Sequence, residues 1–259
     1  MVISLLTDFG TADYFVGAMK GVILSINPAV TVVDLTHEIA PQDVRAGAFT
    51  LAQAAASFPA GTVHVAVVDP GVGSARRGIL ASAGGQFFVG PDNGLFSFIY
   101  EREPGARVFH LTNEKYFGPR VSATFHGRDV FAPVAAWLST GVAPEEFGEG
   151  VADFVRLPGL KPKQASDGTI EAAVIHVDRF GNCVTNLTAE DMPGQARLVI
   201  NGREITSFRR FFSEASDDPS ELFAIWGSAG YLEIAANRAS AAGLLGAERG
   251  QKIIVMSDK

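Results

Sequence analysis

The chain has 259 residues, 47% of them hydrophobic and 19% charged, and its formal net charge at pH 7 is −7. This composition supports a sizeable buried core, which excludes a disordered protein, and the negative charge argues against a nucleic-acid partner. The single cysteine, Cys183, excludes an internal disulfide and a cysteine-rich metal site, and no apolar run approaches the roughly 20 residues that span a bilayer. We therefore expect a soluble, cytoplasmic protein with no membrane partner.

Strand and helix patterns alternate over residues 1–160. Apolar runs predict strands at 2–6, 31–35, 62–68, 79–83, 86–89 and 108–111. Helical spacing and capping residues predict helices near 15–26, 43–58, 93–101 and 130–138. The glycine pair 84–85 predicts a hairpin between two of the strands. This order predicts an α/β domain with a largely parallel central sheet.

The pattern changes at a proline- and lysine-containing linker near 157–163. Beyond it, short apolar runs predict strands at 170–177, 197–200, 223–226, 231–235 and 253–256, separated by turn signals. We expect residues 168–259 to form a second, smaller, β-rich domain.

Charged side chains follow the predicted strands. Asp69 begins the sequence Asp69-Pro70-Gly71-Val72-Gly73 directly after the strand at 62–68, Arg76 comes soon after, and Asp8 follows the first strand. His126 lies between two regular stretches. Because sites usually form where parallel strands end, these residues suggest a reaction site. Each also has a plainer interpretation: a turn cap for Asp69, a helix cap for Asp8, a core or surface histidine, and surface charge for Arg76, as we expect for Arg77.

Seven short motifs together resemble the S-adenosyl-L-methionine (SAM) hydroxide adenosyltransferases, or SAM hydrolases, which are relatives of the SAM-dependent fluorinase and chlorinase. The motifs are Leu6-Thr7-Asp8-Phe9-Gly10, Asp34-Leu35-Thr36-His37, Asp69-Pro70-Gly71-Val72-Gly73, Gly90-Pro91-Asp92-Asn93-Gly94, Phe125-His126-Gly127-Arg128-Asp129, Asp178-Arg179-Phe180-Gly181-Asn182 and the run 227–235. The resemblance implies an N-terminal α/β domain, a C-terminal β-barrel-like domain and a homotrimer. It places each substrate site between the N-terminal domain of one subunit and the C-terminal domain of a neighbour.

The implied reaction is the attack of water on the ribose C5′ of SAM, which yields adenosine and methionine without a cofactor or a metal. By resemblance, Asp69, Arg76 and His126 hold and activate the water, and either Asp69 or His126 accepts its proton. The implied substrate-binding residues are Asp8 at the ribose hydroxyls, Asp13 and Asp178 near the methionine ammonium, Ser228 at the amino-acid part, Asn182 and Phe212 at adenine, and Asn93. The plainer alternatives are a hairpin turn at 178–182 and a core position for Phe212.

Two departures from the fluorinase favour water over a halide ion as the nucleophile. Asp69 stands where the fluorinase has a tyrosine, and Gly127 stands where it has a halide-contacting serine. A carboxylate would repel a halide. A halogenase-type relative and a SAM- or adenosine-binding sensor with little turnover remain the alternatives. A metal-dependent hydrolase is disfavoured, because the five histidines show no zinc-ligand spacing.

Overall fold

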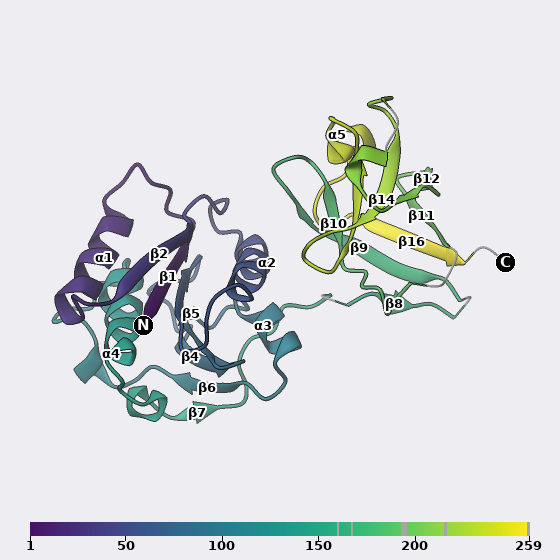
Figure 1. Ribbon diagram of the computed structural model, residues 1–259. Coiled ribbons are helices and arrows are strands. Elements are labelled where there is room, and N and C mark those ends of the chain that lie inside the picture. Colours follow the sequence, from purple (N-terminus) through teal and green to yellow (C-terminus); the bar gives the residue numbers. More distant parts are fainter. Residues whose placement is uncertain (160, 167, 193–195, 215–216, 258–259) are drawn as a thin grey trace. The chain divides into compact units, whose positions relative to one another are not determined.

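The computed structural model describes residues 1–159, 161–166, 168–192, 196–214 and 217–257 (Figure 1). The chain forms two compact units, Met1–Leu157 and Pro158–Lys259. No helix in these described ranges combines the length and apolar character needed to cross a membrane.

The first unit contains a seven-stranded sheet in the order β2-β1-β3-β5-β4-β6-β7. Its strands are β1 (Val2–Thr7), β2 (Thr31–Thr36), β3 (Val63–Val67), β4 (Gly78–Ala83), β5 (Gln86–Pro91), β6 (Arg107–His110) and β7 (Gly150–Val151). The pairs from β2 to β5 are parallel and the pairs from β5 to β7 are antiparallel. The prediction of a largely parallel sheet is therefore wrong for the half that runs from β5 to β7. A two-residue turn joins β4 to β5 and makes this pair antiparallel, and β6 then pairs antiparallel with β4, and β7 with β6, at this side of the sheet.

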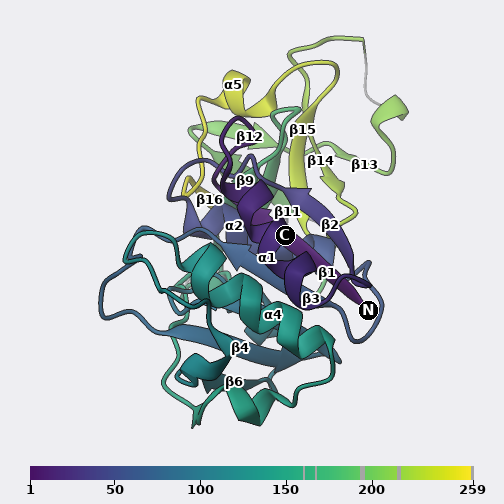
Figure 2. The same ribbon diagram turned by 90° about the vertical axis from the view of Figure 1, so that its left-hand side faces the viewer.

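Helices cover both faces of this sheet, with α1 and α4 on one face and α2 and α3 on the other (Figures 1 and 2). They span α1 (Phe15–Ile26), α2 (Val44–Ala55), α3 (Ser97–Arg102) and α4 (Ala132–Ser139), with 3-10 turns at Glu114–Tyr116 and Pro144–Phe147 and a π-turn at Gly127–Phe131. As predicted, Asp43 caps α2 by accepting a hydrogen bond from Ala46 N at 2.9 Å. Helices α2 and α3 are shorter than predicted.

The second unit is built from β8 (Lys163–Gln164), β9 (Ile170–Val177), β10 (Cys183–Thr185), β11 (Ala196–Ile200), β12 (Arg203–Ile205), β13 (Phe208–Arg209), β14 (Leu222–Trp226), β15 (Leu232–Ala236) and β16 (Lys252–Ser257), with the short helix α5 (Ala241–Leu245) and a 3-10 turn at Phe212–Glu214. In its described part, every strand pair except β13–β14 is antiparallel. The first half of β9 pairs with β16 and its second half with β10, and β12 contacts β14. The sheet is therefore curled around its own apolar core, and closure into a barrel stays a prediction.

Candidate active site

The loop between β3 and β4 carries Asp69 and Arg76. Strand β3 is buried throughout and ends at Val67, so the chain leaves the sheet at the carboxyl end of a parallel strand. Gly73 has a φ of +76°, and a Cβ atom placed on it would lie 2.2 Å from the carbonyl oxygen of Ala123. Glycine permits this close approach, which lays the loop against the segment leading to His126.

Asp69, Arg76 and His126 form one hydrogen-bonded cluster. Arg76 Nε donates to the two carboxylate oxygens of Asp69 at 3.0 and 2.9 Å, and Arg76 Nη2 donates to Asp69 Oδ2. The same Nη2 lies 2.9 Å from His126 Nδ1. The Asp69 side chain is 4% exposed and that of Arg76 is 11% exposed. The structure thus brings the three residues together, and Asp69 pairs with a guanidinium instead of capping the turn after it.

The contact with Arg76 defines the protonation of His126. An arginine can only donate, so His126 Nδ1 must be an acceptor, and the neutral ring carries its proton on Nε2. Burial, followed by the positive charge of Arg76, lowers the pKa of His126, while Asp69 and Asp129 oppose this shift. His126 therefore offers a hydrogen-bond donor at its free nitrogen.

A π-turn at Gly127–Phe131 orients His126, which precedes it directly. Ala132 N donates to Gly127 O across this wide turn, a geometry often found at functional sites. Buried Asp129 supports the turn by accepting from Ser122 N at 2.8 Å and from Arg128 Nε at 2.6 Å. At Gly127, a Cβ atom would lie 3.2 Å from Met19 Sδ and 3.4 Å from the Phe125 ring, so a side chain here would fit only if these neighbours shifted slightly.

Asp8 lies in the turn after β1, and its Oδ2 accepts a hydrogen bond from Gln42 N at 2.7 Å. Helix α1 begins after Tyr14 and has no side-chain cap, so the helix-cap interpretation of Asp8 is wrong. Asp13 is exposed in the segment between Asp8 and α1.

The Asn93 side chain makes hydrogen bonds to two backbone groups. Its Nδ2 donates to Val68 O at 2.8 Å, immediately before Asp69, and its Oδ1 accepts from Leu95 N at 3.2 Å. The neighbouring Asp92 is buried and accepts from Arg77 Nε at 2.9 Å and from Val155 N at 2.8 Å.

Arg77 also donates to Asp153 Oδ1 at 2.7 Å, so the interpretation of Arg77 as plain surface charge is wrong. Its partners are 15 and 76 residues away, and local sequence carries no signal for them.

In the second unit, Asp178 organises the turn that presents Asn182. Its Oδ1 accepts from Phe180 N at 2.9 Å and from Asn182 N at 2.8 Å, and its Oδ2 accepts from Asn182 Nδ2 at 2.9 Å. The turn interpretation of this motif is therefore confirmed. The Asn182 amide is held in place, and its Oδ1 and second amide proton have no partner among the described residues.

Asn182 lines a cavity of about 550 Å³, which is sufficient for a nucleoside. The lining consists of Phe180, Asn182, Phe212, Ala236, Arg238, Ala239 and Ser240. Phe212 is 50% exposed and contacts Phe223 edge to face at 6.0 Å, so it is not a core residue. Phe180, which is 79% exposed, was missed, although an apolar residue at the tip of a turn is an unusual sequence feature. Both rings are available to stack on a flat ligand.

Ser228 is exposed in the turn after β14. Beside this turn lies Glu233, a second residue that the sequence analysis missed. Its Oε1 would lie 1.8 Å from a Cβ atom placed on Gly227. Burial, and then the negative charge of Asp178, raise the pKa of Glu233. Two carboxylates therefore share this side of the second unit.

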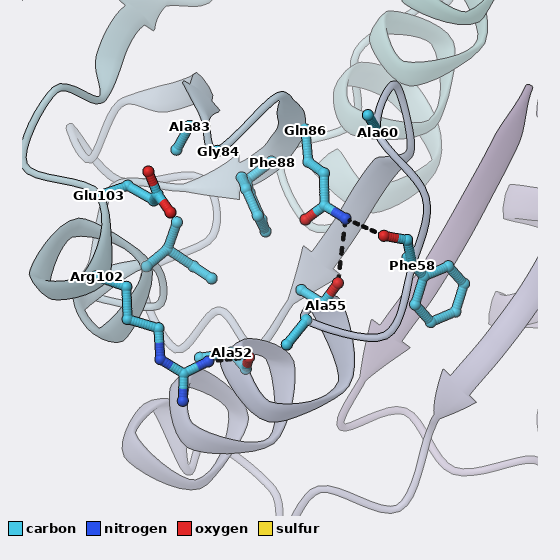
Figure 3. Close-up of a pocket in the computed structure, with 12 residues that line it drawn as sticks. Ala52, Ala55, Phe58, Ala60, Ala83, Gly84, Gln86, Phe88, Arg102 and Glu103 are labelled. Atoms are coloured by element: carbon cyan, nitrogen blue, oxygen red, sulfur yellow. Dashed lines mark hydrogen bonds between the residues drawn. The ribbon is translucent and has the colours of Figure 1, made fainter. Parts of the chain in front are cut away.

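A second cavity, of about 230 Å³, lies in the first unit between the end of α2, the β4–β5 hairpin and α3 (Figure 3). Gln86 Nε2 bridges the carbonyl oxygens of Ala55 and Phe58 at 3.1 and 2.8 Å along its wall. None of the predicted site residues lines this cavity. Within the described residues, no group of three or more His, Cys, Asp and Glu side chains is placed to hold a metal ion.

Two family models match the chain. They are the SAM hydroxide adenosyltransferase N-terminal domain over residues 3–148 and the SAM hydroxide adenosyltransferase C-terminal domain over residues 172–254. Since the two matches span most of its length, this chain belongs to the SAM hydroxide adenosyltransferase family.

Its relatives include the (R)-S-adenosyl-L-methionine hydrolase of Salinispora tropica, which is 42% identical over 98% of this chain and 97% of the relative. The protein of the same name from Thermus thermophilus is 40% identical over 96% of each chain. A fluorinase from an Actinoplanes species is more distant, at 28% identity over 92% of this chain and 91% of the relative. A crystal structure of an uncharacterized conserved protein from Thermotoga maritima covers 98% of this chain and 99% of its own, with a TM-score of 0.88 and 34% identity.

Proposed function

We propose that this protein hydrolyses SAM to adenosine and L-methionine, and that its substrate is the R epimer at sulfur named in its hydrolase relatives. The observation that carries the proposal is the shielded cluster of Asp69, Arg76 and His126 in a member of this family. This cluster combines a carboxylate, a fixed positive charge and a hydrogen-bond donor, which are the groups needed to orient a water molecule.

The nucleophile is the difficult part of this reaction, because the sulfonium is already a good leaving group. As the water oxygen forms a bond to C5′, the C5′–S bond breaks and its electron pair stays on sulfur, which leaves neutral methionine thioether. The water loses one proton in the same process. Since Arg76 occupies His126 Nδ1 and Nε2 carries a proton, His126 donates to the water oxygen and Asp69 accepts the proton. Arg76 stabilises the developing hydroxide.

We assign substrate binding to residues of both units. The Asp8 carboxylate suits the vicinal ribose hydroxyls, because it accepts two hydrogen bonds. Asn182 reads the adenine edge with its free amide groups, and Phe212 stacks on the ring. Asp13 and Asp178 attract the methionine ammonium, and Ser228 binds the amino-acid part. Asn93 acts through the backbone next to Asp69.

The geometry supports water over halide. The Asp69 carboxylate lies inside the cluster, where a halide would meet a buried negative charge. At Gly127, a Cβ atom would press on Met19 and Phe125, which would have to shift slightly to admit a serine, and glycine itself offers no hydroxyl to a halide.

The residues proposed for ribose and water belong to the first unit, and those proposed for adenine belong to the second. We propose that they meet between subunits of a homotrimer in the cytoplasm. Light scattering tests the mass of the assembly. Mixing refolded Asp69→Asn and Asn182→Ala chains tests the shared site, because mixed trimers would regain part of the activity. Two inactive variants that stay inactive after mixing would refute the shared site.

The deciding experiment is incubation of metal-stripped protein with (R)-SAM or (S)-SAM in oxygen-18 water, with and without chloride. We expect methionine and adenosine labelled at the 5′ oxygen, faster turnover of the R epimer, and loss of turnover in Asp69→Asn. Asp153→Asn is the matched control, because it removes another arginine-paired carboxylate at an exposed position. Bound but unconverted SAM would identify a sensor, and a 5′-chloro product would identify a halogenase.

A further inference from the structure

A chain of polar side chains runs from the surface to the turn that carries Asp8. Lys20 Nζ donates to Asp34 Oδ2 at 2.6 Å, and Asp34 Oδ1 lies 3.0 Å from His37 Nε2. His37 Nδ1 lies 2.9 Å from Thr7 Oγ1. Thr7 is fully buried and the His37 side chain is 4% exposed, while Asp34 is 41% exposed. Buried polar groups of this kind are retained where they define a geometry.

The contacts of this polar network run in a consistent direction from donor to acceptor. Asp34 Oδ1 lies 3.0 Å from His37 Nε2 without the alignment of a hydrogen bond, and its negative charge favours the ring proton on this nitrogen. His37 Nδ1 then accepts from the Thr7 hydroxyl, whose oxygen accepts from Phe9 N at 3.2 Å. Burial acts to raise the pKa of Asp34, but the hydrogen bond from Lys20 and the contact with His37 outweigh it and keep the pKa below its usual range. Asp34 therefore stays charged.

A hydroxyl, an imidazole and a carboxylate in this order resemble the Ser-His-Asp triad of nucleophilic enzymes. Thr7 is not a nucleophile here, because it has no exposed surface and its hydroxyl oxygen already receives a backbone N–H. This polar network ends at the backbone N–H of Phe9 and does not open into a site.

His37 holds the Asp8 turn on both sides. Its ring binds Thr7, which precedes Asp8, and its carbonyl oxygen accepts from Gly10 N at 2.8 Å, just beyond Asp8. Gln42, on the segment that follows His37, donates its backbone N–H to the Asp8 carboxylate at 2.7 Å. The position of Asp8 thus depends on the 34–42 segment more than on its own neighbours.

We propose that His37 is a positioning residue that fixes the Asp8 carboxylate to read the ribose 2′- and 3′-hydroxyls, with Thr7 as its hydrogen-bond partner and Asp34 as its charged neighbour. This inference rests on the proposed function, because it assigns the ribose to Asp8. A carboxylate that accepts two hydroxyl groups at once must be held closely in place, and displacement by about 1 Å can cost a factor of about 100.

The test is calorimetric binding of adenosine and 2′-deoxyadenosine to the full-length protein. Loss of a hydrogen bond to a charged acceptor corresponds to a preference for adenosine of about ten- to a hundredfold in the wild type. We expect Thr7→Val and His37→Phe to reduce this preference to about threefold or less, and Thr7→Ser, which keeps the hydroxyl, to retain it. Asp34→Asn, at the exposed end of the chain, is expected to give an intermediate loss and avoids a buried substitution.

Ser4→Ala is the matched control, because Ser4 Oγ makes a similar buried contact with His64 Nδ1, at 2.6 Å, on the same strand. It should lower the thermal unfolding temperature while leaving the adenosine preference unchanged. Folded Thr7→Val and Asp34→Asn proteins with the wild-type preference would overturn the proposal, as would a wild type with no preference. Failure of the wild type to convert SAM would overturn the proposed reaction alone, since nucleoside preference is measured without turnover.

Discussion

His64 is expected to make this protein less stable in mild acid. The side chain has no exposed surface, stacks on Phe88 at 5.0 Å and meets Phe58 at 5.4 Å. Burial lowers its pKa from 6.5 to about 4, against an opposing hydrogen bond from Gln86. The unfolded chain therefore takes up a proton near pH 6.5, whereas the folded protein does so only near pH 4. At about 1.4 kcal/mol for each pH unit, acidification across this interval lowers the free energy of unfolding by about 3 kcal/mol.

The double variant Ser4→Ala/His64→Phe removes the titrating ring together with its hydroxyl partner. In a Trp226→Phe background, Trp137 is the one tryptophan left and reports on the first unit. Urea unfolding followed by its fluorescence, at steps between pH 7.5 and 4.5, yields the free energy of unfolding of both proteins. Carboxylate titration affects the reference protein and the variant alike. We therefore expect the free energy of unfolding of the reference protein to fall by about 2–3 kcal/mol more than that of the variant. Equal losses would refute the reasoning.

Three further expectations concern the site. Gly73→Ala should lower both stability and kcat, because the new Cβ atom would lie 2.2 Å from Ala123 O. Gly61→Ala is the control: it also has a positive φ but no atom within 4 Å, so it should show only the backbone penalty of about 1 kcal/mol. Equal thermal unfolding temperatures for the two variants would contradict this reasoning. In an NMR titration, Arg76→Gln should raise the pKa of His126, because a nearby positive charge is removed, and an unchanged or lower pKa would count against the assigned cluster. Phe212→Ala should weaken adenosine binding by about five- to a hundredfold through lost stacking, which calorimetry measures, and undiminished affinity would place adenine elsewhere.

Local patterns in the sequence predicted most elements and several of their contacts. The spacing of Phe15, Met19 and Ile26 matches α1, Asp43 caps α2 as expected, and the glycine pair 84–85 joins β4 to β5. These features depend on residues a few positions apart, so the chain shows them without its fold. The predicted end of α2 and the predicted start of α3 were less accurate, because helix ends respond to tertiary packing. At the end of α2, for example, the Gln86 side chain donates to the carbonyl oxygens of Ala55 and Phe58.

The motifs of the chain predicted by themselves that a carboxylate, a guanidinium and an imidazole belong to one site. Only the tertiary structure decided how these three groups contact one another. Asp69 and His126 are held by the same Arg76 although Arg76 and His126 are 50 residues apart, and this contact defines which nitrogen of His126 carries the proton. The antiparallel pairing of β6 with β4 and the support of Asp8 by His37 likewise arise from contacts between distant segments. Side-chain periodicity reports which face of an element is buried, whereas a hydrogen-bond partner is chosen only when packing brings two faces together.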